Sequence, residues 1–296
     1  MKGRGRHFLR VAMMALLLFV LFVWCYGFFV GRFRYRVHRQ EISFYDLPPE
    51  FDGYRIVQFS DLHVGSFSPG HEIEVQNVVD LINGQRADLV VFTGDLVNRS
   101  SEELKDYRCM LSGLSAPDGV CAVLGNHDYA LYRRSLTSEE RRADRERLVK
   151  CMEEYGWTPL LNGNVKVRRG EACIYVVGVE NQGYLRSYFP KYARLEKAMR
   201  GVGKEDFKVV LSHDPTHWKH DVVGKTNVQL TLSGHTHAGQ FEVFGWSPVC
   251  WIYPEWKGTY VEGAQVLNVS VGVGSLVPFR FGALPEINVI TLRRAK

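Results

Sequence analysis

Short runs of apolar, mostly β-branched residues recur along the chain, and five of them end abruptly in polar residues. Runs of this length and composition predict buried strands. The five runs occupy residues 55–59, 88–92, 120–124, 207–211 and 228–232. Further strands are predicted around Val165 and Val167 and over residues 171–179, 265–273 and 285–292.

Between these runs the spacing of apolar residues changes to that of a helix. Four residues spaced i, i+3, i+4 and i+7 are Val75, Val78, Val79 and Ile82. Together with the following Gly84 they predict a helix that ends there. Ser100-x-x-Glu103 and Thr137-x-x-Glu140 are typical of capping boxes that begin further helices. Alternating strands and helices predict an α/β fold, in which ligand-binding residues gather at the carboxyl ends of strands.

The longest apolar run lies near the N-terminus, where residues 11–31 contain no charge. A bilayer core requires about 20 such residues, so this run predicts a transmembrane helix. A cleaved signal peptide is the alternative, but the run is too long and no small-residue cleavage site follows it. We therefore expect a basic N-terminal segment (1–10), a single-pass membrane anchor (11–31), a basic juxtamembrane linker (32–50) and one large domain (51–296).

The net charge of +5 belongs to the N-terminal part of the chain. Eight of the 37 basic residues precede Glu41, the first acidic residue, which leaves 29 basic against 32 acidic residues beyond them. The mildly acidic remainder argues against a nucleic-acid-binding surface. Four arginines between residues 32 and 39 are placed to contact anionic membrane head groups. Four basic residues flank each side of the anchor, so the positive-inside rule does not assign its orientation.

All five strand ends carry residues that can bind a metal ion. They are Asp61 and His63, Asp95, Asn126 with His127 and Asp128, His213, and finally His235 with His237. The last pair lies in a Gly-His-Thr-His-Ala-Gly-Gln stretch, where flanking glycines allow both imidazoles to face one point. Taken alone, that stretch could be a polar turn after a strand. Because metal-binding residues follow five strands at one edge of a sheet, the sequence predicts a common metal centre.

The ordered motifs DLH, GDL, GNHD, SHDP and GHTH resemble the calcineurin-like metallophosphoesterase superfamily over residues 52–292. The GHTHAGQ wording and the Pro285-Glu286-Ile287 tail are most similar to its membrane-anchored bacterial branch, which includes enzymes similar to the UDP-2,3-diacylglucosamine hydrolases of lipid A synthesis. The resemblance implies a four-layer α-β-β-α sandwich, with two mixed sheets flanked by helices, and a metallophosphoesterase catalytic domain over residues 51–296.

The resemblance also implies two divalent metal ions, for which Mn, Fe or Zn suit the ligands. One ion would be held by Asp61, His63, Asp95 and His237. The second would be held by Asp95, Asn126, His213 and His235, with Asp95 bridging. His127 would stand over the phosphate as an acid or charge stabiliser, and Asp128 would fix its tautomer.

The expected function is that of a membrane-anchored phosphohydrolase that cleaves a phosphodiester or pyrophosphate bond by a metal-activated hydroxide. A lipid-linked phosphoester such as UDP-2,3-diacylglucosamine is the favoured substrate class, and it would favour the cytoplasmic face of the membrane. The alternatives are a generic phosphodiesterase, a nuclease or a cyclic-nucleotide phosphodiesterase, and a non-catalytic relative that binds a partner. The oligomeric state stays open.

The segment 244–260 holds three of the six tryptophans and two prolines. Aromatic packing around an irregular loop is the favoured interpretation. An apolar rim that contacts an acyl chain or the bilayer is the alternative.

Overall fold

The computed structural model of the chain describes residues 2–67, 70–186 and 189–295, and their strands form two six-stranded mixed sheets. The first sheet has the order β1 (Arg36–Phe44), β12 (Glu286–Arg294), β2 (Arg55–Phe59), β3 (Leu89–Phe92), β4 (Val120–Ala122) and β5 (Trp157–Pro159). The second has the order β10 (Gly258–Glu262), β11 (Gln265–Val269), β9 (Leu230–Ser233), β8 (Phe207–Leu211), β7 (Ala172–Gly178) and β6 (Gly163–Arg169). Strands β2 to β5 are parallel, as are β11, β9, β8 and β7.

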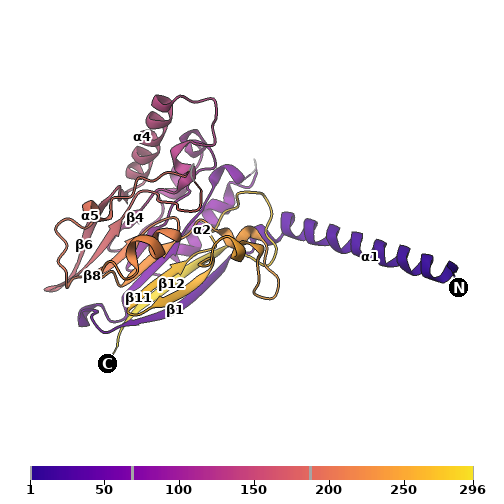
Figure 1. Cartoon of the computed structure of the whole chain (residues 1–296). Coiled ribbons are helices and arrows are strands. Elements are labelled where there is room, and N and C mark those ends of the chain that lie inside the picture. The colour runs from indigo at the N-terminus through magenta and orange to yellow at the C-terminus, as the bar shows by residue number, and fades with distance from the viewer. Residues whose placement is uncertain (1, 68–69, 187–188, 296) are drawn as a thin grey trace.

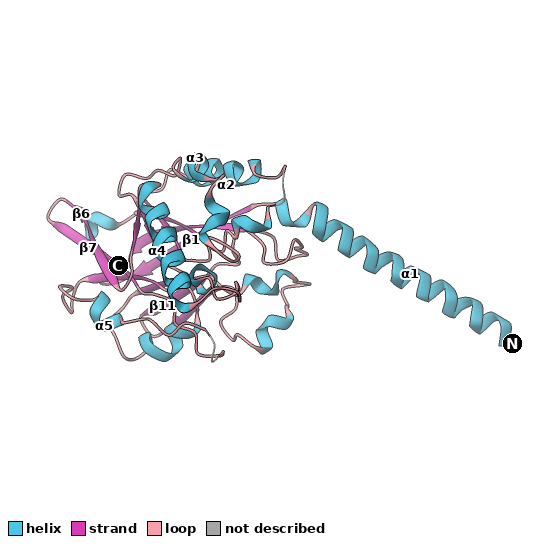
Figure 2. Ribbon diagram, turned by 90° about the horizontal axis from the view of Figure 1, so that it is seen from above, coloured by secondary structure: helices cyan, strands magenta, loops and turns pink. Residues whose placement is uncertain are grey.

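The two sheets pack face to face, and helices cover their outer faces. The helices α2 (Ile73–Asn83), α3 (Arg108–Leu111) and α4 (Ser138–Glu154) share one apolar core with the first sheet. The helix α5 (Leu195–Ala198) and a π-helical turn (Trp218–Val222) cover the second. A separate core lies between the sheets, where Ile56 and Val91 meet Val176 and Leu232. Figure 2 shows the helices on both sides of the strands, so the predicted four-layer sandwich is confirmed.

The predicted apolar stripe of α2 faces the first sheet. Its four side chains are 0–1% exposed. Burying each contributes about 1.5 to 3 kcal/mol, which is why this helix forms where the spacing predicts it. The capping box at Thr137 begins α4, since its hydroxyl accepts from Glu140 N at 3.2 Å and the Glu140 carboxylate accepts from Thr137 N at 2.7 Å.

The capping box at Ser100 opens only a single 3₁₀ turn rather than a longer helix. The described 3₁₀ turns are Gly31–Phe33, Pro49–Phe51, Val64–Ser66, Ser101–Leu104, Asn126–Tyr129, His237–Gln240 and Pro248–Trp251. The turns at Val64, Asn126 and His237 lie next to predicted metal ligands, so short turns rather than long helices follow the strands that carry the site.

The N-terminal helix α1 (Lys2–Phe29) projects from the rest of the molecule, and only its C-terminal end contacts it (Figure 1). Among the described residues, the segment His7–Phe33 is long and apolar enough to cross a membrane, and its most apolar window has no buried residue. A signal sequence has the same length and composition, so the helix alone is weak evidence for a membrane span.

The segment predicted as a basic juxtamembrane linker differs from that expectation. Nine of its residues form β1, which pairs in parallel with β12 at the edge of the first sheet. Ile42 and Phe44, near the C-terminal end of β1, are buried in the core between the sheets. The sheet therefore begins at Arg36 and not at residue 51.

Candidate metal centre

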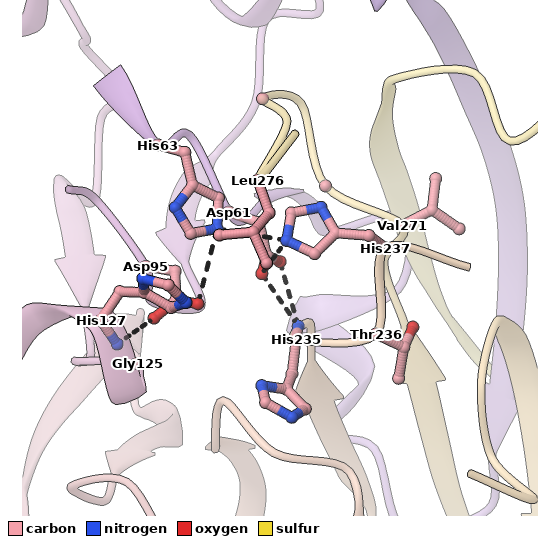
Figure 3. Close-up of polar contacts among 12 residues, drawn as sticks. Asp61, His63, Asp95, Gly125, His127, His235, Thr236, His237, Val271 and Leu276 are labelled. Atoms are coloured by element: carbon pink, nitrogen blue, oxygen red, sulfur yellow. Dashed lines mark hydrogen bonds and ion pairs between the residues drawn. The ribbon is translucent and has the colours of Figure 1, made fainter. Parts of the chain in front are cut away.

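The carboxyl ends of five parallel strands, β2, β3, β4, β8 and β9, meet at one edge of the two sheets. The loops that follow them carry every predicted ligand: Asp61 and His63, Asp95, Asn126, His213, and His235 with His237. Three overlapping groups of ligand atoms lie within 4.8 Å of one another: Asp61, His63 and His237; His63, Asp95 and His127; Asp95, His213 and His235. In Figure 3 the side chains of Asp61, His63, Asp95, His127 and His237 converge from separate loops.

One half of the cluster is formed by Asp61, His63 and His237. The Nε2 atoms of His63 and His237 are 3.1 Å apart, and His237 Nε2 is 3.3 Å from Asp61 Oδ1. Ligand atoms about 2.1 Å from one ion stand roughly 3.0 to 3.4 Å apart in octahedral or tetrahedral geometry. These spacings fit a shared cation.

The other half is formed by Asp95, Asn126, His213 and His235. Asp95 Oδ2 is 3.2 Å from His213 Nε2 and 3.6 Å from His63 Nε2, so Asp95 lies between the two halves. His213 Nε2 is 3.2 Å from His235 Nδ1. The buried Asn126 Oδ1 has no hydrogen-bond partner among the described residues, although its Nδ2 donates to Tyr132 Oη. A buried acceptor without a donor fits a cation ligand.

Backbone carbonyls fix which ring nitrogen of the histidines faces the cluster. Val97 O lies 3.2 Å from His63 Nδ1, and Thr93 O lies 2.7 Å from His213 Nδ1. Because a carbonyl only accepts, each Nδ1 carries the proton, and each Nε2 offers its lone pair to the cluster in the neutral ring.

The predicted pairing of Asp128 with His127 is wrong. His127 Nδ1 donates instead to Asn98 O at 2.7 Å, and the ring stacks on Tyr132 with centroids 4.1 Å apart. Asp128 points the opposite way. Its two carboxylate oxygens accept four backbone N–H groups, those of Asp95, Leu96, Val97 and Gly125. Asp128 therefore holds together the loops that carry Asp95 and Asn126.

The backbone at the ligands is strained. Five of the seven predicted ligands have positive φ angles between 45° and 76°, in the left-handed region: Asp61, His63, Asp95, His235 and His237. Residues other than glycine rarely adopt it, and such strain gathers at functional sites. Gly234 allows the close approach expected of the glycine before His235, because a Cβ there would lie 1.9 Å from Ser60 Oγ and 2.4 Å from Asp61 Oδ2.

Burial and charge set the protonation of the cluster in the metal-free chain. Burial raises the pKa of Asp61 to about 6 and lowers the pKa of His63 to about 3 and of His235 to about 4. Burial also disfavours both charged forms in the Asp95–His213 pair, but their mutual attraction outweighs it. The pKa of His213 rises to about 10, and the pKa of Asp95 falls well below its usual value. A proton thus lies between these two side chains where a cation would bind.

A fully buried arginine, which the sequence patterns did not single out, contacts the cluster. Arg280 Nη2 is 3.1 Å from His237 Nδ1, and the guanidinium also donates to Val271 O, Gly274 O and Ala283 O. Burial lowers the pKa of Arg280 to about 10. Only the placement of one arginine in an otherwise apolar loop, Pro278–Phe281, could have pointed to it.

The cluster opens into a cavity of about 390 Å³. Besides predicted site residues, its walls contain Tyr132, Arg186, Phe189, Ile252, Tyr253 and Leu276. Tyr253 Oη lies 2.7 Å from His235 Nε2, on the side of the ring away from His213. Leu276, labelled in Figure 3, lines this cavity together with the ligands. The cavity therefore has the polar and charged ligands at its base and partly apolar walls.

Comparison with known proteins agrees with this geometry. Residues 54–239 match the family model described as calcineurin-like phosphoesterase. The chain is 29% identical over 259 residues to the uncharacterized metallophosphoesterase YkuE of Bacillus subtilis (83% of this chain, 82% of that protein). It is 29% identical to a transmembrane protein with metallophosphoesterase domain from Danio rerio (86% and 56%). It is also 27% identical to the UDP-2,3-diacylglucosamine pyrophosphatase LpxG of Chlamydia muridarum (82% and 86%).

Proposed function

Because this chain belongs to the calcineurin-like phosphoesterase family, and its predicted ligands converge, we propose that it is a membrane-anchored, di-metal hydrolase of a lipid-linked phosphodiester or pyrophosphate. The coarser prediction, a metal-dependent phosphoester hydrolase, is confirmed by the family match and by the metallophosphoesterase relatives. The observation that carries the proposal is the meeting of seven buried or nearly buried ligands from five strand ends, including the unpartnered Asn126 Oδ1.

We assign the ligands to two cation sites that share Asp95. Asp61, His63, Asp95 and His237 would form one, and Asp95, Asn126, His213 and His235 the other; the distances within each half support this division. When bound, two divalent cations supply positive charge that lowers the pKa of a bound water toward about 7 and attracts an anionic phosphoester. Only two of these ligands, Asp61 and Asp95, are carboxylates, so half of that charge stays uncompensated.

His127 is the residue assigned to act on the substrate. Its Nδ1–H is held by Asn98 O and its ring by Tyr132, so Nε2 is left to face the cavity. From that position the protonated ring, with a proton on both nitrogens, can donate from Nε2 to a phosphate oxygen or to the leaving group. Asp128 positions Asp95 and Asn126 through their backbone.

The membrane location is supported by two observations, and the lipid-linked substrate by two others. The relative from Danio rerio is named as a transmembrane protein, and α1 is long and apolar enough to span a bilayer. The cavity walls include Phe189, Ile252 and Leu276 beside Arg186, which suits a phosphate next to an apolar group. UDP-2,3-diacylglucosamine is the first candidate, since the LpxG relative acts on it by name, and it would place the domain in the cytoplasm.

The test is a substrate screen with a matched pair of variants. The purified full-length chain in detergent with Mn²⁺ is offered UDP-2,3-diacylglucosamine, cyclic nucleotides, DNA and a chromogenic phosphodiester. Asn126→Ala is expected to reduce kcat/KM on the order of 100-fold or more, since it removes a cation ligand. Asn77→Ala, on the exposed face of α2, is the control and keeps full activity. Full turnover by Asn126→Ala would refute the metal-site assignment.

A further inference from the structure

Large apolar side chains are exposed around the mouth of the metal cavity. Outside residues 8–30, the described part of the chain exposes twelve of them, and half lie in two loops. We call these six the apolar rim: Phe244, Trp246, Trp251, Ile252, Leu276 and Val277. Phe244 is fully exposed and Trp251 is 77% exposed. Ile252 and Leu276 also line the cavity, so the rim is continuous with the site.

The rim is built to hold these side chains outward. The buried amide of Gln240, at the end of the GHTHAGQ stretch, clamps the second loop. Its Nε2 donates to Val277 O at 2.7 Å and Phe279 O at 2.6 Å, and its Oε1 accepts from the backbone N–H groups of Leu276 and Val277 at 3.1 Å. In the first loop, the buried Ser247 Oγ donates to Ala238 O at 2.8 Å. A loop with this much hydrogen bonding keeps its apolar residues exposed rather than folding over them.

The rim lies at the same end of the molecule as α1. In Figure 1 the orange and yellow loops of the C-terminal part gather where the helix leaves the body. Phe279, two residues after Val277, packs on Trp24 with ring centroids 5.7 Å apart, and Arg280 N donates to Gly27 O at 3.0 Å. The fit is close, because a Cβ at Gly27 would lie 2.3 Å from the Phe279 ring.

These contacts fix the position of the apolar rim along the axis of α1. Trp24 lies five residues, about 7.5 Å, before the end of α1 at Phe29. The loop that contacts it is therefore level with the last turns of the apolar helix. Arg34 donates to Tyr26 Oη at 3.3 Å, and Tyr26 packs against Phe281, so aromatic rings and a guanidinium lie at one level. This combination is typical of a membrane interface.

We propose that the apolar rim inserts into the bilayer that holds α1, so that the metal cavity opens at the membrane surface and receives the phosphoester head group of a lipid in that bilayer. The proposal rests on the proposed function for its substrate class and for the membrane anchor, but not on turnover of any substrate. The exposed part of the segment 244–260 then agrees with the alternative interpretation of that segment, an apolar rim that contacts the bilayer. The buried part agrees with aromatic packing, since Tyr253 contacts His235 and Trp256 packs on Ala238.

The test measures the depth of Trp251 in the full-length chain, reconstituted in phosphatidylcholine vesicles with or without brominated acyl chains. Trp24→Phe is the background, because it removes the tryptophan of the anchor. In that background we expect brominated lipid to quench the tryptophan fluorescence. Adding Trp251→Phe should lower this quenching, with Trp246 as the remaining rim tryptophan, and adding Trp218→Phe, at a buried position in the π-helical turn, should leave it unchanged.

Equal quenching in the two double variants, or none in the background, would overturn the proposal. A rim covered by a second copy of the chain would also leave Trp251 unquenched by lipid, and so would count against insertion. The measurement needs no turnover. A chain that hydrolyses no phosphoester could still show an inserted rim, whereas an active enzyme without quenching would refute the rim alone.

Discussion

Replacing Asp128 by Asn tests whether one buried carboxylate organises the metal centre through backbone hydrogen bonds. Oδ2 accepts from Asp95 N and Gly125 N, both at 2.9 Å, and Oδ1 accepts from Leu96 N at 2.8 Å and Val97 N at 3.3 Å. Asn keeps the shape of the side chain but offers one oxygen. Its NH₂ group must then face two backbone donors that have no other acceptor among the described residues.

The magnitude follows from those two donors. A buried donor left without an acceptor costs about 1 to 3 kcal/mol. The Asn oxygen is expected to stay with the two 2.9 Å bonds, so the amide faces Leu96 N and the already long Val97 contact. We therefore expect Asp128→Asn to lower the free energy of unfolding by about 2 to 4 kcal/mol. The loss also loosens the loops of Asp95 and Asn126, so more metal should be needed for half-maximal activity.

The assay is denaturant unfolding of the metal-free and the metal-loaded chain in detergent, with metal titrated against activity. It is done at pH 8, above the pKa of about 7 to which burial raises Asp128, so that the wild-type carboxylate is ionised. The matched control is Glu103→Gln. Glu103 also accepts three backbone N–H groups, but it is partly exposed, so water can replace it at a cost of about 1 kcal/mol or less. If Asp128→Asn were no more destabilising than Glu103→Gln, the reasoning would be refuted.

Two further predictions concern the proton and the arginine that contact the ligands. The folded pKa of His213, about 10, lies above its unfolded value of 6.5, so its pairing with Asp95 stabilises the metal-free chain fully below pH 6.5 and is lost as pH rises through 10. Since a cation must displace that proton, its affinity should rise about tenfold per pH unit between pH 7 and 9; calorimetry in buffers of different ionisation enthalpy would show one proton released, and a pH-independent affinity would contradict this. Arg280→Lys should cost about 2 to 4 kcal/mol, because one ammonium cannot pair with three carbonyls and His237 together. It should also lower the bound metal measured per chain, and unchanged metal content would reduce Arg280 to a purely structural role.

The strands that carry the site could be predicted because they are buried on both faces. The strand β2 was predicted with its observed bounds, 55–59, and β8 likewise. Parallel strands in a four-layer fold are almost continuously apolar, and each ends where polar ligands begin, so pattern and chemistry agree. The segment that forms β1 could not be recognised in the same way. It is an edge strand with five exposed residues, and its arginines resemble a membrane-proximal cluster.

The ligands were predictable, but their supporting contacts were not. Neighbouring residues on a 3₁₀ turn point in different directions, so His127 faces the cavity while Asp128 turns to the backbone behind it. Carbonyl acceptors such as Asn98 O belong to every residue and leave no mark in a sequence. Arg280 reaches His237 across 43 positions, and only the folded loop brings them together.

The strain at the ligands explains why the rest of the fold is so well buried around them. A left-handed backbone costs about 1 to 2 kcal/mol at a residue other than glycine, so five such ligands cost about 5 to 10 kcal/mol. That sum is comparable with the whole stability of an ordinary domain. His63 and His237 do not add to it in the metal-free chain, because Arg280 donates to His237 Nδ1, so the neutral His237 ring can donate its Nε2–H to His63 Nε2 at 3.1 Å. The ligand loops can keep this arrangement only because both ends of each are anchored in buried structure: parallel strands on one side, and the contacts of Asp128 and Arg280 on the other. A chain under no selection for a cation site would have no reason to hold so much unfavourable geometry at a single point.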